Sequence, residues 1–144
     1  MSEEVREIYI ELWSLCKDVE RPLCHKYRSL RELFERVARE QMQNISLQAT
    51  DLAARINYLS TQFSFDGWLK YALHTFRLTS NDVMNHRKEP LDDEFFRDVR
   101  SVTEAVHVML HTPIPKELAE TLPSRMSKKL MKRGENVLER RIRV

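Results

Sequence analysis

The segment DDEFFRDVRSVTEAVHVML, residues 92–110, carries apolar side chains at spacings of three and four. An α-helix turns by about 100° per residue, so this spacing gathers the apolar side chains on one face. The residues of that face are Phe95, Phe96, Val99, Val102, Val106, Met109 and Leu110. The segment therefore predicts a long amphipathic helix, capped by Asp92 or Asp93, that must pack against other apolar helix faces.

The segment before it, from about residue 67 to residue 86, has the same period. Its apolar residues fall within one arc of the helical wheel: Leu69, Ala72, Leu73, Phe76, Val83 and Met84. Because both helices present an apolar face, we expect six residues to pack between them, namely Leu73, Phe76, Phe96, Val99, Val102 and Val106. Pro90 separates the two helices, since the residue before a proline is restricted to extended geometry.

Helical periodicity also covers most of the remaining chain. We expect helices over residues 3–20, over residues 29–43, and from Ser46 or Thr50 to about residue 63. Ser29 and Glu32 match the spacing of a capping box at the start of the second of these. Pro115 suits the first turn of a short helix through Leu122.

Composition agrees with a helical protein. The chain of 144 residues holds only two glycines, Gly67 and Gly134, and no Asn-Gly turn, which is unusual for a sheet protein. With 42% hydrophobic and 32% charged residues it is too apolar for disorder. The prediction is an all-α, compact bundle of about five helices, with a domain at residues 1–123.

The N-terminal segment lacks the basic and apolar regions of a signal peptide, and no apolar run reaches the length of a membrane span. We therefore expect a cytoplasmic protein with no membrane association. Cys16 and Cys24 are too few for a disulfide framework and are expected to be reduced thiols, Cys16 buried and Cys24 near a helix boundary. Trp13 and Trp68 are expected to fill the core or its edge. No metal site and no cofactor is expected.

Residues 124–144 form a basic tail. They carry a net charge of +6, so the other 123 residues carry −4. Its basic residues are Arg125, Lys128, Lys129, Lys132, Arg133, Arg140, Arg141 and Arg143. Such a tail is typical of segments that bind RNA or DNA phosphates, although docking of Met126, Leu130 and Leu138 onto the acidic body is an equal alternative.

Polar side chains border the apolar face of the helix at residues 67–86. We call the following residues the polar stripe: Lys70, His74, Arg77, Asn81 and Asn85. They recur at spacings of three and four and so lie along one side of the helix. One interpretation is a structural network in which Arg77 pairs with Asp92, Asp93 or Asp98. The other is a binding site for an anion such as a nucleic-acid phosphate, whose geometry suits arginine.

The stretch LHTFRLTSNDVMNH, followed by a short loop and DDEFFRDVRSVTEAVHVML, resembles the late helices of HEPN domains (higher eukaryotes and prokaryotes nucleotide-binding). The resemblance covers about residues 69–110, and Arg77, Asn81 and His86 are the matching positions. It implies a helical bundle, and in the active members an arginine and a histidine that meet across a dimer and cleave RNA with the ribose 2′-hydroxyl as nucleophile.

Those enzymes separate the arginine and histidine by four to six residues. Here eight residues separate Arg77 from His86, and nine helical steps place them on opposite sides of a continuous helix. No other catalytic motif is present. We therefore expect a non-catalytic binding or accessory module, associated with nucleic acid or with a nucleic-acid enzyme, which self-associates or binds a protein partner. The alternatives are a HEPN-type ribonuclease that uses Arg77 and His86, and a bundle that binds only proteins.

Overall fold

The computed structural model describes residues 1–42 and 51–123, and over these residues the chain is all-helical with no strand. The helices are α1 (Glu3–Lys17), α2 (Leu23–Gln41), α3 (Leu52–Gln62), α4 (Gly67–Met84), α5 (Asp92–Leu110) and α6 (Lys116–Thr121). The prediction of an all-α bundle is confirmed, with five longer helices and the short α6. The predicted basic tail at residues 124–144 lies outside the described residues.

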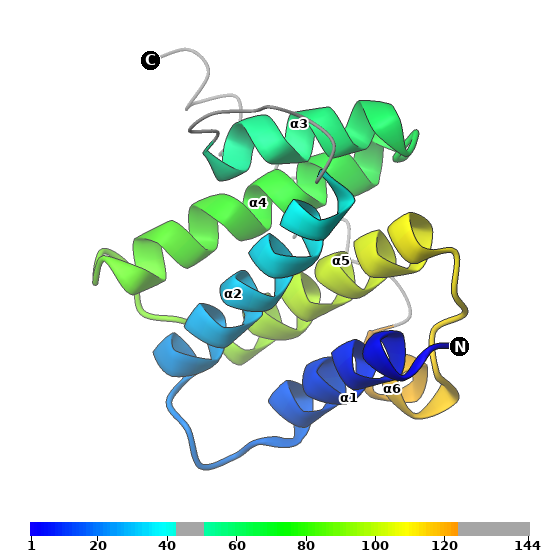
Figure 1. Ribbon diagram of the computed structural model, residues 1–144. Helices are drawn as coiled ribbons and strands as arrows, with labels where there is room; N and C mark the ends of the chain where they lie inside the picture. Colours follow the sequence, from blue (N-terminus) through cyan, green and yellow to red (C-terminus); the bar gives the residue numbers. More distant parts are fainter. Residues whose placement is uncertain (43–50, 124–144) are drawn as a thin grey trace.

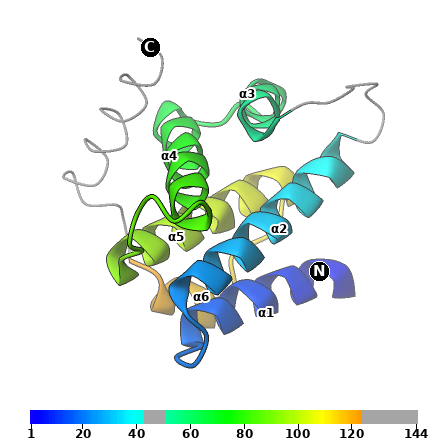
Figure 2. The ribbon, with the colours of Figure 1, turned by 90° about the vertical axis from the view of Figure 1, so that its left-hand side faces the viewer.

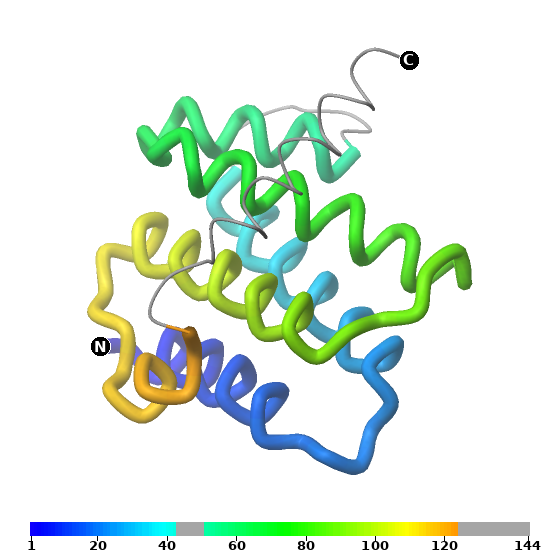
Figure 3. The backbone as a smooth tube through the Cα atoms, turned by 180° about the vertical axis from the view of Figure 1, so that it is seen from behind, coloured from blue at the N-terminus to red at the C-terminus, as the bar shows by residue number. Residues whose placement is uncertain are grey.

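The helices form three layers (Figures 1 and 2). Helices α3 and α4 make one layer, α2 and α5 the middle layer, and α1 with α6 the third. Figure 3, the view from behind, shows α6 lying beside α1 and below α5. Helices α2 and α5 contact each other and both α1 and α4, so these two helices form the centre of the bundle.

The core lies on both sides of α5. Five of the six predicted core residues are fully buried, namely Leu73, Phe76, Val99, Val102 and Val106, whereas Phe96 is half-buried. Aromatic pairs join the layers: Phe76 of α4 meets Phe34 of α2 edge to face, and Phe95 of α5 meets Tyr27 of α2 in the same way. These pairs favour one registry of the three helices because edge-to-face contacts depend on orientation.

The predicted start of the second helix is wrong. Helix α2 begins at Leu23, directly after Pro22, and Ser29 lies inside it. The proline fixes its own φ near the value that leads into a helix, and its carbonyl accepts hydrogen bonds from the backbone N–H groups of His25 and Lys26. The Ser-x-x-Glu spacing at Ser29 is therefore only a chance match to a capping box.

Two other helices begin at residues that differ slightly from the predicted ones. Helix α3 is capped by Asp51, whose carboxylate accepts from the N–H of Ala54, rather than by Ser46 or Thr50. Helix α5 has Leu91 at its N-cap, so Asp92 and Asp93 lie in the first turn, where acidic side chains suit the positive end of the helix dipole. In the described part of the chain no helix has the length and apolarity needed to cross a membrane.

Candidate functional site

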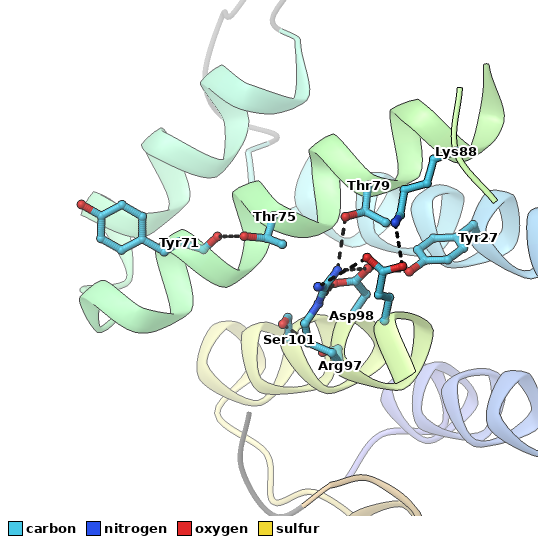
Figure 4. A network of polar contacts seen from close by, with 9 residues as sticks. Tyr27, Tyr71, Thr75, Thr79, Lys88, Arg97, Asp98 and Ser101 are labelled. Carbon is cyan, nitrogen blue, oxygen red and sulfur yellow. Dashed lines mark hydrogen bonds and ion pairs between the residues drawn. The ribbon is translucent and has the colours of Figure 1, made fainter. Parts of the chain in front are cut away.

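A cluster of charged side chains lies buried between α2, α4 and α5. We call it the buried ion cluster and define it as Tyr27, Thr79, Lys88, Glu94, Arg97 and Asp98. Figure 4 shows the side chains that it labels from this cluster pointing toward one another: Tyr27 of α2, Thr79 of α4, Lys88 of the loop after α4, and Arg97 and Asp98 of α5. Asp98 is 0% exposed and Arg97 2%, so neither charge is hydrated.

Every oxygen of Asp98 has a donor. The Arg97 guanidinium binds the carboxylate in a bidentate manner: Nε donates to Oδ1 at 2.9 Å and Nη2 donates to Oδ2 at 3.0 Å. The Tyr27 hydroxyl donates to Oδ2 at 2.7 Å, and Arg97 Nη2 also donates to the Thr79 hydroxyl at 3.2 Å. Complete burial raises the pKa of the Asp98 carboxyl, and the donors from Arg97 and Tyr27 oppose this rise. The arrangement ties α5 to α2 and α4.

The charged side chains at the solvent-facing edge of the cluster also form ion pairs. Lys88 Nζ lies 2.9 Å from Glu94 Oε1, and Glu94 Oε2 lies 4.0 Å from Arg97 Nη1. Two cations thus alternate with two anions. Each charge of this network has an ion-pair partner, and only Lys88, at its outer edge, is partly exposed, so we assign the network a structural role.

The polar stripe on α4 is divided between buried and exposed residues. Its middle makes bonds to neighbouring helices: Asn81 accepts a hydrogen bond from Arg31 of α2, and His74 bonds to Asn57 of α3. At its ends, Lys70 and Asn85 are exposed, and the Asn85 amide donates to the Asn81 carbonyl at 2.8 Å. Asn81 and His74 of the stripe therefore link α4 to α2 and to α3.

His74 is held in one neutral tautomer. Arg77 Nε donates to its Nδ1 at 3.3 Å, so the ring proton lies on Nε2, which is 2.8 Å from Asn57 Oδ1. The ring is only 4% exposed. Burial, followed by the charges of Arg77 and Lys70, lowers the pKa of His74 from 6.5 to about 4. His74 is consequently uncharged near neutral pH and is poorly suited to bind a phosphate.

The predicted acid partners of Arg77 occupy different places. Asp92 and Asp93 are exposed in the first turn of α5, and Asp98 is engaged with Arg97 and Tyr27. The Arg77 side chain donates a hydrogen bond from Nε to His74 Nδ1. Arg97 is buried in this interface, and the sequence does not reveal it because an Arg-Asp pair within a helix looks like a solvated pair of charges.

Arg77 and His86 are directed to different neighbours. Arg77 bonds one turn back along α4, toward the side that α3 covers. His86 follows the end of α4 in a left-handed conformation with φ 57° and is exposed beside the start of α2. Their separation along the helix is about 13 Å for nine residues. The two side chains do not form a shared site within one chain.

His86 instead lines a groove with a volume of about 610 Å³. We call it the His86 groove; its lining residues are Pro22, Leu23, Cys24, Val83, His86, Arg87, Lys88, Glu89 and Pro90. Three consecutive basic side chains, His86, Arg87 and Lys88, therefore border one concave surface. Cys24 is half-buried there, whereas Cys16 is buried in the core, where burial raises its thiol pKa to about 11.

Comparison with protein-family models, with curated proteins and with solved structures finds no match for this chain. Among residues 1–42 and 51–123, no group of three or more histidine, cysteine or acidic side chains is arranged to hold a metal ion.

Proposed function

We propose that the chain is a non-catalytic helical binding module that associates with nucleic acid through its phosphates; the resemblance to HEPN domains supports the association with nucleic acid. The observation that carries the proposal is the His86 groove, where His86, Arg87 and Lys88 border one concavity. A phosphodiester backbone binds to such a surface by charge and needs no base-reading group.

The charged residues of the groove determine how tightly it can bind a phosphate backbone. Lys88 is already paired with Glu94, and Glu89 also lines the groove, so Arg87 supplies the positive charge for a ligand and the His86 imidazole offers a hydrogen bond. With so few contacts the groove is a weak site, and the basic residues at 124–144 supply the additional charge. We expect micromolar or weaker binding at physiological salt, without sequence preference.

The first experiment measures binding of labelled single-stranded RNA and DNA to the full chain by fluorescence anisotropy. Arg87→Glu should weaken binding several-fold, because it reverses a charge in the groove. Arg39→Glu is the matched control, since it makes the same change at an exposed position of α2 outside the groove. Equal affinities of the two variants would remove the groove from the proposal.

The reactivity of Cys24 gives a second and direct measure of whether nucleic acid occupies the groove. An alkylating reagent should modify Cys24 faster than Cys16, whose thiol is buried and has a raised pKa. Nucleic acid in the groove should slow the modification of Cys24 and leave that of Cys16 unchanged. If saturating RNA and DNA protect neither cysteine, the ligand lies elsewhere.

The ribonuclease alternative is tested on the same chain. RNA cleavage by the wild type that is abolished in His86→Ala would replace the non-catalytic proposal with a HEPN-type enzyme. A bundle that binds only proteins predicts no nucleic-acid affinity at any salt concentration.

A further inference from the structure

Helix α1 exposes a stripe of residues on the side opposite the core. We call it the α1 stripe; it consists of Glu3, Arg6, Ile10, Trp13 and Lys17. The residues are spaced alternately by three and four, which places them along one narrow line on a helix. Ile10 is 53% exposed and Trp13 38%, whereas Leu12 and Leu15 on the other side of α1 are buried.

An apolar groove runs beside this stripe. Arg6, Ile10 and Trp13 of α1 line this groove together with Ile114, which precedes α6, and Leu118 of α6. Its volume is about 530 Å³, enough to accept large apolar side chains from a neighbouring molecule. The surface therefore offers both exposed apolar side chains and a cavity that fits side chains of the same kind.

The order of charges along the stripe identifies the neighbour. The stripe begins with an acid, Glu3, ends with a base, Lys17, and has Ile10 at its midpoint. If a second α1 runs antiparallel with Ile10 facing Ile10, each Glu3 faces Lys17 of the other copy. Arg6 then faces Trp13 of the other copy, a pairing that cation–π attraction favours.

The spacing of the residues in the α1 stripe also fits an antiparallel pair. Spacings of three, four, three and four become four, three, four and three when read backwards, so facing positions agree to within one residue, about 1.5 Å of helix rise. A parallel pair would set Glu3 against Glu3 and Lys17 against Lys17. We propose that α1 is the interface of a homodimer in which two α1 helices pack antiparallel about a two-fold axis near Ile10.

The interface is expected to be weak. A helix of 15 residues is about 22 Å long, so the pair and its flanking groove bury less than the roughly 1,600 Å² of a standard interface. A dissociation constant in the micromolar range or weaker is expected, because small interfaces are typically transient. Sedimentation velocity of the full chain over a concentration series that spans this range should show a monomer–dimer equilibrium.

The centre of the interface is tested with Ile10→Glu. This substitution sets two like charges against each other across the axis and should abolish the dimer. Leu91→Glu is the matched control, because Leu91 is similarly exposed, at 49%, on another part of the molecule. Circular dichroism verifies that both variants keep their helices. A dimer that survives Ile10→Glu, or a wild-type chain that stays monomeric at 500 µM or more, overturns the proposal.

The antiparallel arrangement is tested with two charge reversals. Glu3→Lys alone and Lys17→Glu alone each place like charges at both ends of the pair, and each should weaken the dimer several-fold. An equimolar mixture of the two variants should associate again, because every facing pair in the mixed dimer has opposite charges. Failure of the mixture to associate more strongly than either variant overturns the antiparallel pairing.

Discussion

His74 is buried in neutral form, and this makes the stability of the α3–α4 contact depend on pH. The pKa of His74 is 6.5 when the chain is unfolded and about 4 in the fold. The unfolded state therefore binds more protons between these values. The stabilising contribution is complete above pH 6.5 and is lost as the pH falls through about 4, with a slope of at most about 1.4 kcal/mol per pH unit.

Urea unfolding of the wild type and of His74→Gln from pH 7 to pH 4 measures this contribution. Glutamine can still donate to Asn57 but does not titrate, so the variant should lose less stability over this range. Carboxylates titrate in both proteins, and the difference between the two curves isolates the histidine. Parallel curves would show that the ring is not held neutral.

Arg97 and Asp98 are expected to be far more costly to remove singly than together. Arg97→Met leaves the fully buried Asp98 without its ion-pair partner and should cost about 3–5 kcal/mol in the free energy of unfolding. The double variant Arg97→Met with Asp98→Leu removes both charges and should recover much of that loss. Denaturant unfolding of both variants tests this, and additive losses would contradict a closed ion pair.

Tyr27→Phe in the same cluster removes one donor from Asp98 and keeps the aromatic ring that meets Phe95. Because the lost partner is a buried carboxylate, we expect a loss of about 1.5–3 kcal/mol by denaturant unfolding. Tyr71→Phe is the control, since Tyr71 is 45% exposed, and it should change stability by less than about 0.5 kcal/mol. Equal losses would contradict a structural role for the Tyr27 hydroxyl.

Periodicity identifies which residues of a helix face the core, but it does not identify buried polar partners. The position of Val99 and Val102 follows from their spacing. Arg97 and Asp98 lie in the same segment and look like solvated charges, and only the packing of α2 and α4 over that face buries them. The bond between Asn81 and Arg31 joins residues 50 positions apart, and one-dimensional spacing contains no information on such a pair.

At the scale of the element, helix ends depend on backbone conformation as well as on side-chain patterns. The start of α2 was misplaced because Pro22 supplies an N-cap carbonyl that the Ser29 pattern does not reveal. The segment predicted as a helix over residues 92–110 does end at Leu110. There His111 adopts a left-handed conformation, with φ 52° and ψ 44°, which side chains with a Cβ atom adopt at a cost.

This conformation makes His111→Gly an unusual case of a glycine that stabilises a helical protein. Glycine relieves the strain at the left-handed position, which stabilises the folded state, whereas its greater freedom in the unfolded chain opposes this. Because the relief is the larger effect, we expect the free energy of unfolding to rise by about 0.5–1 kcal/mol. Thermal or urea unfolding measures it. The control is Arg39→Gly in the exposed part of α2, which should lose about 1 kcal/mol. A loss in both variants would contradict the left-handed cap.

At the scale of the whole molecule, the His86 groove and the α1 stripe lie on different elements. The His86 groove lies where the loop after α4 meets the start of α2, whereas the α1 stripe lies in the layer of α1 and α6 (Figures 1 and 2). The two surfaces share no residue. Dimerisation through α1 would therefore leave the His86 groove of each protomer open. Two weak phosphate sites on one dimer bind a long nucleic acid more strongly than a single site does.

The basic tail adds a charge of +6 to this arrangement, and its contribution is measurable by salt dependence. Each phosphate that it neutralises should add about 0.7 to 0.9 to the slope of log affinity against log salt. Removing residues 124–144 should lower both the affinity for RNA or DNA and this slope, while Arg87→Glu in the full chain should lower the slope by about one contact. Both proteins are compared with the wild type from 50 to 300 mM salt. Equal affinities and slopes for the full chain and the truncated chain would exclude the tail from binding, because a charge of this size cannot engage phosphates without releasing counterions.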